Sequence, residues 1–563
     1  MAQRFRRGQC LGVCLVWVAV VLCLPPGDVF PQTPLPGEGS AALDAAQALG
    51  ATAQATAASA TAPQGTLVQA RSTATPPQMT AAQYQTFLEQ LAQSHRPGPP
   101  SATTIAPLVQ NRGPEVPSPD PTRNATDSFL LFRDSVIPST GIAGGYAFSS
   151  PIGEPSLAVS GKIIFQTGNW YASYSHDNGA TWNFLNPFTL FGTDFCCDQV
   201  TLYDASRDRY FWLLQYSDRL VLANTADPSG SWCAWNITPA WFGLPANTEL
   251  DYNDLALSKN FLYLTTNLFT GASGSLIARF PLDPLTTCSS FNFNWVQRTD
   301  SFTFKPVQGA VDVMYWGSNW GQTNGSSFRI YSWAENSGQY FFYDRTIPTF
   351  TFMVRNNGQN CASANGVVTN WCQFADSRVL GGYLAQDVNG AGGVLGFSFN
   401  AQQDASFPFP YTYRVYFSES DKTFLARTNL WATWGALLFL SLAPNTRGNI
   451  GGTFTWGGGT GTSAYYPGWG LLIDDDFAPT QPWHVAYIRY GGGNACPDSR
   501  TGLGRWGDYL TVRPFSPVGA VWVASGYTIQ GNHCGVTGWY AEPRNAIFGR
   551  GRDAGSVTRW QSE

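Results

Sequence analysis

Short strand-like segments recur along the C-terminal part of this chain, and they limit its fold more than any other feature. Segments such as SLAVSGKIIFQT, YFWLLQY and NFLYLTTN either alternate apolar and polar residues or are apolar throughout, and turn residues separate them. Almost no stretch has the spacing of an amphipathic helix. The sequence therefore predicts an all-β fold.

The strand-like segments themselves belong to a longer repeat. Seven stretches resemble the start of one unit: GEPSLAV at 153, CDQVTLY at 197, LDYNDLAL at 250, GAVDVMYW at 309, SRVLGGYLA at 377, RGNIGGTFTW at 447 and WGDYLTV at 506. A spacing of roughly 45 to 70 residues is that of a four-stranded propeller blade with variable loops. We predict a single β-propeller of about seven four-stranded blades, alternatively six, over residues 124–563. The Gly-rich fifth and sixth units are the hardest to delimit.

Two segments in front of the repeat are predicted not to fold with it. Residues 1–26 combine three arginines, an apolar run of roughly 15 residues and two prolines, which is the order of a secretory signal. Because a membrane-spanning helix needs ~20 residues, a cleaved signal is preferred over a signal anchor, and a lipid anchor at Cys23 is a weaker alternative. Residues 27–123, rich in Ala, Thr and Pro, are predicted to be a disordered stalk or propeptide, because they cannot bury enough apolar surface.

The cysteines agree with export. Of the 11 cysteines, three lie in the signal, and an even set of eight remains, which in an exported chain indicates disulfides. The interpretation pairs Cys361 with Cys372 and Cys496 with Cys534, and it lets the adjacent Cys196 and Cys197 reach Cys233 and Cys288. No CxxC pair occurs and the chain has four His, so a zinc-type site has little support.

Charge and hydropathy limit the classes of partner that the chain is expected to bind. The formal net charge is −5, without basic clusters, which argues against nucleic acid. No long apolar run follows the signal, so no membrane span is predicted after it. We expect a secreted, extracellular monomer.

The stretch YSHDNGATW at 174 has the pattern S-x-D-x-G-x-T-W, carried by Ser175, Asp177, Gly179 and Trp182. The Asp side chain can accept backbone N–H bonds across a turn, Gly permits a positive φ, and Trp can pack between sheets. A related form, TADPSGSW, occurs one unit later. The pattern predicts a turn that stabilises a blade and has a structural role.

This pattern resembles the Asp box, or BNR repeat, of sialidase-like propellers. The segments YPGWGLLIDDDF, GRWGDYLTVRP, WVASGYTIQGN and EPRNAIFGR are similar to segments of a largely uncharacterised group of secreted bacterial proteins labelled exo-α-sialidase-like. The resemblance covers roughly residues 127 to 552. It implies a propeller fold and suggests carbohydrate or a glycoconjugate as partner, but it carries over no activity.

The sialidase motif itself is broken. True sialidases hold the substrate carboxylate with three arginines, and the first lies in F-R-I-P. Here FRDSVIP at 132 separates Phe132 and Arg133 from Ile137 and Pro138 by three residues. The segment DSFLLFRDS is predicted instead to be an N-terminal strand that closes the ring against the last blade.

Acidic and aromatic residues recur near the unit starts, where inner strands should line the mouth of a central channel. The catalytic candidates are Asp508, Tyr509, Glu154, Asp198 and Asp251. The ligand-binding candidates are Asp254, Arg505, Arg447, Arg378, Trp506, Trp316 and Trp320.

Three interpretations of the acids stay open. They accept backbone N–H bonds from neighbouring blades, they hold Ca²⁺, or they perform acid–base catalysis with one raised pKa. The leading hypothesis is a secreted propeller that acts on or binds glycans at the channel mouth, as a glycoside hydrolase if the acids converge. The alternative is a non-catalytic extracellular binding propeller whose acids are structural or bind Ca²⁺.

Overall fold

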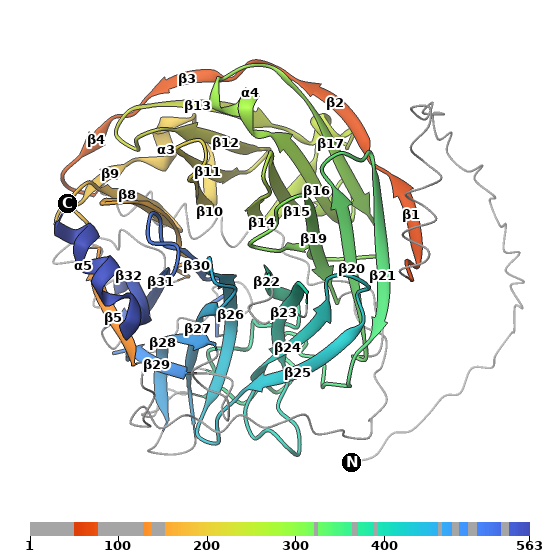
Figure 1. The fold of residues 1–563 in the computed structure, drawn as a ribbon, viewed down its shortest axis with the longest axis vertical. Helices are drawn as coiled ribbons and strands as arrows, with labels where there is room; N and C mark the ends of the chain where they lie inside the picture. The colour runs from red at the N-terminus through yellow and green to blue at the C-terminus, as the bar shows by residue number, and fades with distance from the viewer. Residues whose placement is uncertain are drawn as a thin grey trace, which may run out of the picture. The chain divides into compact units, whose positions relative to one another are not determined.

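The computed structural model describes residues 50–76, 128–137, 152–319, 325–362, 370–386, 392–459, 464–475, 484–493, 504–530 and 540–562. From Ala46 onward the chain forms one compact unit. Its strands make seven antiparallel sheets, arranged as blades around a common axis (Figure 1). The predicted all-β propeller of seven four-stranded blades is confirmed.

The first four blades follow the chain in order. Blade 1 contains β6 (Ser156–Ser160), β7 (Ile163–Gly168), β8 (Tyr171–Ser175) and β9 (Asn183–Leu185). Blade 2 contains β10 (Phe195–Asp204), β11 (Arg209–Tyr216), β12 (Leu220–Thr225) and β13 (Ser231–Ile237). Blade 3 contains β14 (Thr248–Leu257), β15 (Phe261–Thr270), β16 (Gly274–Pro281) and β17 (Phe291–Arg298). Blade 4 contains β18 (Lys305–Pro306), β19 (Val313–Ser318), β20 (Ser327–Ala334) and β21 (Gln339–Thr346).

The last three blades complete the ring. Blade 5 contains β22 (Val379–Ala385), β23 (Val394–Ala401), β24 (Tyr411–Ser418) and β25 (Phe424–Leu430). Blade 6 contains β26 (Ala436–Pro444), β27 (Ile450–Gly458), β28 (Tyr465–Asp474) and β29 (His484–Arg489). Blade 7 contains β30 (Thr511–Pro514), β31 (Trp522–Gln530), β32 (Tyr540–Arg550) and β5 (Phe129–Val136). The short helices are α3 (Pro187–Leu190), η1 (Pro239–Phe242), α4 (Leu282–Thr286), η3 (Gly551–Asp553) and α5 (Ala554–Ser562).

Strand direction defines two ends of the channel. The first strand of each blade lies nearest the axis, and successive strands in a blade are antiparallel (Figure 1). The inner strands therefore all begin at one end, which we call the mouth. Turns between the third and fourth strands lie at the opposite end, which we call the far end.

The repeat starts coincide with inner strands in five of the seven blades. In blades 4 and 6, GAVDVMYW and RGNIGGTFTW fall on the second strands, β19 and β27. The inner strand β18 is only two residues long, and the continuous apolar run of β26 lacks the Gly and Asp residues that mark other unit starts. The Gly-rich segment around residues 394–401 is a regular strand, β23.

The N-terminal strand β5 closes the ring, as predicted from DSFLLFRDS. It pairs antiparallel with β32, so Arg133 lies opposite Ile547 and Phe129 opposite Arg550. Arg544 of β32 binds Asp134 of β5 with bonds of 3.1 and 2.6 Å. The first and last parts of the described propeller thus share one sheet.

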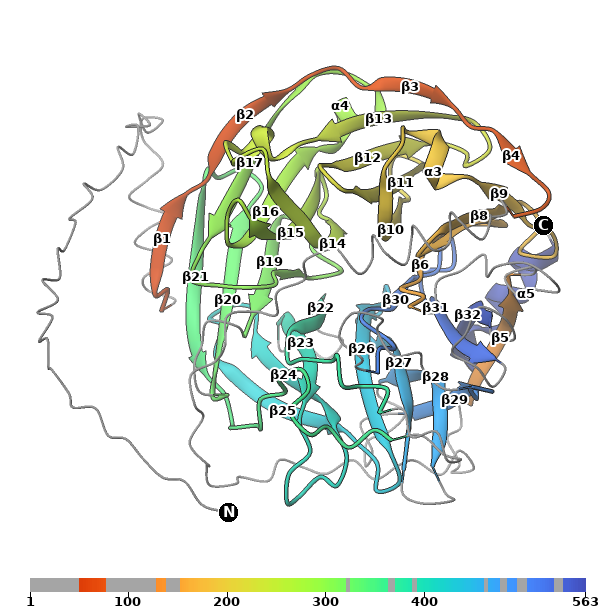
Figure 2. The same ribbon diagram turned by 180° about the vertical axis from the view of Figure 1, so that it is seen from behind.

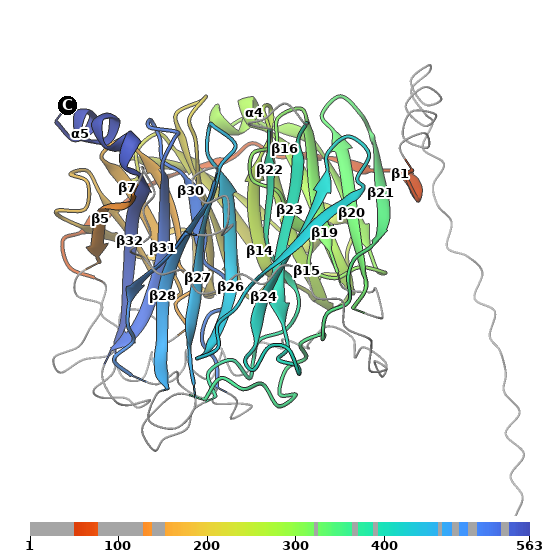
Figure 3. The same cartoon turned by 60° about the horizontal axis from the view of Figure 1, so that its bottom comes forward.

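Residues 53–73, which the composition assigned to a disordered stalk, form four strands that we call the belt. The belt consists of β1 (Ala53–Thr56), β2 (Ala58–Ala62), β3 (Thr66–Gln69) and β4 (Ser72–Thr73). These strands pair with the outermost strands of blades 4, 3, 2 and 1 in that order. Figures 2 and 3 show the belt following the outer rim of the ring.

The belt folds although it buries little apolar surface. Its hydrogen-bonding partners are blade edges, whose N–H and C=O groups would otherwise have no strand beside them. Small side chains let the backbone approach, and polar ones add contacts, such as Thr61 with Asn292 at 2.7 Å and Ser231 with Gln69 at 2.7 Å. The expectation of disorder was therefore wrong for these residues.

Three disulfides are described. Cys361 binds Cys372, as predicted. Cys233 binds Cys288, and the adjacent Cys196 and Cys197 bind each other, so the predicted bonds between these two pairs were wrong. The reason is that Cys196 and Cys197 lie on an inner strand, whereas Cys233 lies on the outermost core strand of the same blade. Cys496 and Cys534 lie outside the described residues.

The YSHDNGATW turn connects β8 and β9 at the far end. Asp177 accepts hydrogen bonds from the backbone N–H of Thr181 at 2.8 Å and from the Ser175 hydroxyl at 2.8 Å. Gly179 has φ 73°, and Trp182 is buried. The geometry is that of a stabilised turn away from the mouth, while the assignment as an Asp box stays a prediction.

Within the part of the chain that the structure describes, no helix is long and apolar enough to span a membrane.

Candidate functional site: the mouth and cavity of the central channel

The inner strands share an unusual backbone position near the mouth. Five non-glycine residues there have positive φ: Glu154 (40°), Tyr252 (61°), Thr303 (56°), Phe439 (57°) and Asp508 (82°). Such residues persist only where the surroundings fix them, and they gather at functional sites. Each one is followed two positions later by a residue that lines a central cavity, and Asp198 has the same relation to Val200.

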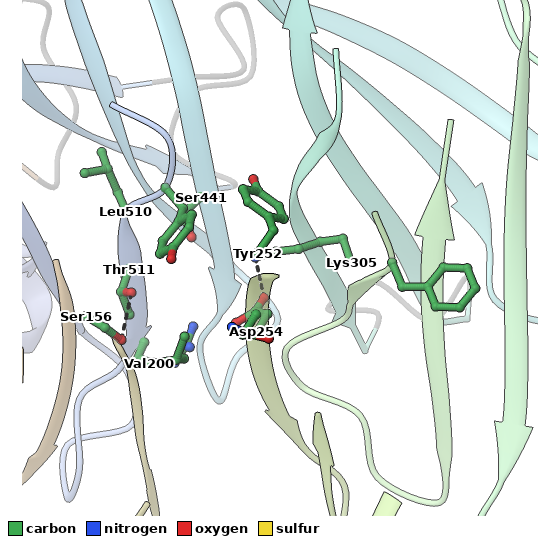
Figure 4. A pocket seen from close by; sticks show the side chains of 12 residues that line it. Ser156, Val200, Tyr252, Asp254, Lys305, Ser441, Leu510 and Thr511 are labelled. Carbon is green, nitrogen blue, oxygen red and sulfur yellow. Dashed lines mark hydrogen bonds and ion pairs between the residues drawn. The ribbon is translucent and has the colours of Figure 1, made fainter. Parts of the chain in front are cut away.

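The cavity has a volume of about 440 Å³, including the part open to solvent. Its walls come from the inner strands of six blades and from the residues that lead into these strands. In Figure 4, Tyr252, Asp254 and Lys305 face Ser156, Thr511 and Leu510 across it. The rings of Tyr252 and Tyr509 meet edge to face at 5.3 Å. The channel thus has an aromatic, partly polar interior.

Charged groups lie in the cavity wall. Asp254 forms an ion pair with Lys305 and accepts the Leu255 backbone N–H at 2.8 Å. Burial lowers the pKa of the nearby Arg513, and the negative charge of Asp254 acts in the opposite direction. The Thr511 hydroxyl donates to the Ser156 hydroxyl at 3.2 Å (Figure 4). The cavity therefore offers a carboxylate, two cations and several hydroxyls within a small volume.

Arg505 connects two acids at the mouth. Its Nη2 lies 2.7 Å from Asp508 Oδ2 and 3.3 Å from Glu154 Oε1. Glu154 also accepts Asn169 Nδ2 at 2.7 Å. Glu154, Arg505 and Asp508 are all less than one-tenth exposed. This buried group joins blade 7 to blade 1.

A second charged group sits beside the first. Asp376 accepts Nε and Nη2 of Arg378 at 2.7 and 2.5 Å, and Arg355 Nε lies 3.3 Å from the same carboxylate. The guanidinium of Arg355 stacks on Phe374 at 4.1 Å, and that of Arg505 lies over the same ring at 4.7 Å. Phe374 thus connects the two charged groups.

Arg355, Phe374 and Asp376 were not predicted. They lie on the long connection between β21 and β22, which has no strand pattern. The connection packs on the segment before β30, because Phe374 N–H donates to the Gly504 carbonyl at 3.3 Å and Gly504 N–H donates to Gln373 Oε1 at 3.0 Å. An arginine and an acid in such a segment give no signal without the fold.

The electrostatics keep the tyrosine of this site protonated. Burial raises the pKa of Tyr252 well above its usual value, while Arg378, whose guanidinium lies 4.3 Å from the ring, acts to lower it. Although burial acts to raise it, the positive charges of Arg378 and Arg355 lower the pKa of Asp376. Burial and the charge of Arg378 lower the pKa of Arg355 to about 10. Near neutral pH, Tyr252 is therefore a hydrogen-bond donor and not a nucleophilic phenolate.

The structure brings most predicted site residues to the mouth, but not all. Asp198 and Asp251 are buried there, and Asp251 Oδ1 accepts the Tyr252 N–H at 2.6 Å. Arg447 lies at the far end of blade 6 and binds Asp553 with Nη1 at 3.0 Å. Its position in the turn between β26 and β27 excludes it from the mouth.

Two of the three tryptophan candidates, Trp316 and Trp506, are buried. Trp316 is buried and stacks on Tyr331 at 4.9 Å within blade 4. Trp506 is buried between Trp371, at 5.7 Å, and Tyr527, at 4.9 Å. Both rings pack in the interior, the usual role of large aromatics in a propeller. Trp320 lies outside the described residues.

A metal site finds little support. Among the described residues, no three His, Cys, Asp or Glu side chains come together in a way that could hold a metal ion. Ca²⁺ prefers six to eight oxygen ligands. Glu154 and Asp508 instead bind Arg505, and Asp251 accepts the Tyr252 backbone N–H.

Comparisons with known proteins assign no family to the chain. No protein-family model and no curated protein matches the chain. Similar solved structures include a protein of unknown function from Dyadobacter fermentans DSM 18053 (9% identity, 75% of this chain and 99% of that chain, TM-score 0.35). A subtype N10 neuraminidase-like protein of A/little yellow-shouldered bat/Guatemala is 7% identical (55% and 93% covered, TM-score 0.30). An endo-arabinase from Bacteroides thetaiotaomicron VPI-5482 is 10% identical (53% and 95% covered, TM-score 0.26).

Proposed function

We propose that this protein is an exported glycan-binding propeller whose ligand enters the central channel at the mouth. The observation that carries the proposal is the cavity in which Tyr252 and Tyr509 stand beside Asp254, Lys305 and several hydroxyls. A sugar has apolar C–H faces that pack on aromatic rings, and hydroxyls that both donate and accept hydrogen bonds. A wall with rings, a carboxylate, cations and hydroxyls matches that combination.

The burial and the arginine partners of the acids at the mouth favour binding over catalysis. Glu154 and Asp508 are buried and share Arg505, and Asp376 is held by two arginines. A catalytic acid needs contact with the substrate and a pKa near the working pH. The positive charges of Arg378 and Arg355 lower the pKa of Asp376, and the ion pairs of all three acids indicate a structural role.

The test is glycan binding by the full chain on a glycan array, followed by calorimetry with the best ligand. Asp254→Asn and Tyr509→Ala should each weaken binding at least tenfold, because each removes a group that lines the cavity. The matched control is Asp283→Asn, an exposed acid at the far end between β16 and β17, which should leave affinity unchanged. Equal affinity in all four proteins would refute the channel site, and the absence of any glycan ligand would refute the function.

Hydrolysis is the second candidate, and one observation favours it. The carboxylate oxygens of Glu154 and Asp508 lie 3.3 and 2.7 Å from the same nitrogen, so they are at most 6.0 Å apart. Retaining glycosidases place two carboxyl groups about 5 to 5.5 Å apart. Product release that Asp508→Asn abolishes, with binding retained, would establish catalysis. Binding without product in the unchanged protein would leave a binding propeller.

A further inference from the structure

Blade 6 carries a group of aromatic rings, two of them exposed, that the channel site does not use. We call Trp434, Trp456, Tyr465, Tyr487 and Tyr490 the aromatic patch. The ring of Trp456 lies 4.7 to 5.7 Å from those of the other four. Tyr465 is 41% exposed and Tyr490 is 57% exposed. Exposed apolar residues that gather in one place mark interaction sites more often than scattered ones do.

The patch lies at the mouth end of its blade. Trp434 lies two residues before the inner strand β26. Trp456 lies two residues before the end of β27, and Tyr465 begins β28, the strand that meets β27 at this end. Tyr490 follows the last residue of β29, which also ends there. The patch therefore occupies the same face of the ring as the channel entrance.

Two glycines let the backbone lie close to the aromatic patch and to the connection beside the mouth. A Cβ on Gly468 would come within 2.4 Å of the Trp456 ring, so the indole lies flat against this backbone. A Cβ on Gly458 would lie 3.2 Å from Cys361 Cα, so the patch adjoins the disulfide-bonded connection beside the mouth. No large side chain can stand at either glycine, and the rings of Tyr465 and Tyr490 remain exposed.

The chemistry of the patch is neutral. The nearest basic residue along the chain, Arg489, is engaged by Glu542 at 2.8 and 3.0 Å. Within the described residues, the hydroxyls of Tyr465 and Tyr490 have no hydrogen-bond partner. Aromatic faces with two available phenol groups suit uncharged hexose or pentose rings. A stable protein interface buries about 800 Å² per partner, which is far more than two exposed tyrosines offer.

We infer that the aromatic patch is a second carbohydrate contact, which binds the neutral outer part of a long glycan. This inference rests on the proposed function, because the same chain would enter the channel with its end. Linked contacts on one ligand raise affinity without either contact becoming stronger. Long chains should therefore bind more tightly than short ones, and the patch should account for the difference.

The experiment compares chain lengths. Full-length protein is run through native gels that contain xylan, arabinan or galactan, and calorimetry is done with the matching trisaccharides. Tyr465→Ala/Tyr490→Ala should weaken binding of the polysaccharide at least tenfold and leave the trisaccharide unchanged. The control is Leu425→Ala, which removes an equally exposed apolar side chain, 53% exposed, from blade 5.

The outcomes separate the two proposals. If the double variant binds polysaccharide as the unchanged protein does, while Asp254→Asn still weakens binding, the patch inference is wrong and the channel site stands. If neither polysaccharide nor trisaccharide binds the unchanged protein, both proposals are wrong. Tyr465→Phe/Tyr490→Phe tests stacking: it keeps the rings, so it should lose less affinity than the alanine variant.

Discussion

The outermost strands of blades 1 to 4 pair with a further strand, whereas those of blades 5 and 6 do not pair with one among the described residues. Each of blades 1 to 4 has a fifth strand from the belt, whereas among the described residues β25 and β29 have none. In the belted part, Arg207, in the turn between β10 and β11, binds Asp283, whose side chain is 83% exposed. Beyond the belt, Arg414 (2% exposed) binds Asp474 (21% exposed), and Arg550 (1% exposed) binds Asp475 (0% exposed).

The difference shows two ways of joining propeller blades. In the belted part, one continuous segment forms main-chain hydrogen bonds with the outer strands of four successive blades. Its ion pairs can therefore stay at the surface, where each contributes little. The part without the belt uses buried charges, which depend on both partners being present. It also carries the Cys361–Cys372 connection, Asp376 and the aromatic patch, whereas Tyr252, Asp254 and Lys305 of the cavity come from the belted blades.

Of the changes proposed here, deleting the belt should lower the stability of the protein most. Without residues 50–76, four blade edges lose their hydrogen-bonded partner, and each such bond contributes on the order of 1 kcal/mol. We expect a loss of at least several kcal/mol in unfolding free energy, together with aggregation through the exposed edges. Urea unfolding and light scattering measure both. Deleting residues 31–45 is the control, and equal stability of the two deletions would mean that the belt is not a structural part.

A pair of aspartates tests the role of burial. Asp376 and Asp300 each hold two arginines, but the Asp300 side chain is 48% exposed and that of Asp376 is 3% exposed. Removing one partner of a buried pair destabilises by about 3 to 5 kcal/mol, whereas exposed pairs are worth about 1 kcal/mol or less. We expect Asp376→Asn to lie in the first range and Asp300→Asn in the second, measured by urea unfolding. Similar values for the two would contradict the proposed contrast between the two parts.

The smallest expected effect is a pH dependence at the seam of blades 6 and 7. Arg550 Nη1 donates to His484 Nδ1 at 2.6 Å, and burial together with the charge of Arg550 lowers the pKa of His484. The unfolded chain therefore takes up a proton more readily, so stability falls as the pH drops below about 6.5. His484→Asn should remove a pH-dependent loss of below about 1 kcal/mol. His176→Asn, at an exposed contact with Asp227, is the control; an unchanged pH profile in His484→Asn would refute this assignment.

The sequence predicted the elements whose signal is local. Alternating strands and their spacing gave the blades, and the apolar segment before Asp134 gave the closing strand β5. The turn at Asp177 was predictable because its hydrogen bonds lie within seven residues. The Cys361–Cys372 pair was predictable for the same reason.

The features that sequence reasoning missed depend on distant partners. The Ala- and Thr-rich belt has no apolar pattern of its own, and edges hundreds of residues away satisfy its backbone. Asp376 and Arg355 become a charged group only when their connection packs against Gly504. Trp316 was expected at a ligand site, since abundance of tryptophan cannot distinguish an exposed ring from one that packs between strands.

The belt also sets an order of events during synthesis. Its first strand ends at Thr56, and the strand it pairs with ends at Thr346, so 290 residues must follow before that edge exists. At roughly 5–20 residues per second, the early segment waits about 15 to 60 seconds. A sequence of small and polar residues suits that interval. Such residues do not drive an early hydrophobic collapse, and they do not promote aggregation with other nascent chains. The composition that resembled disorder is therefore the composition that a late-docking strand needs.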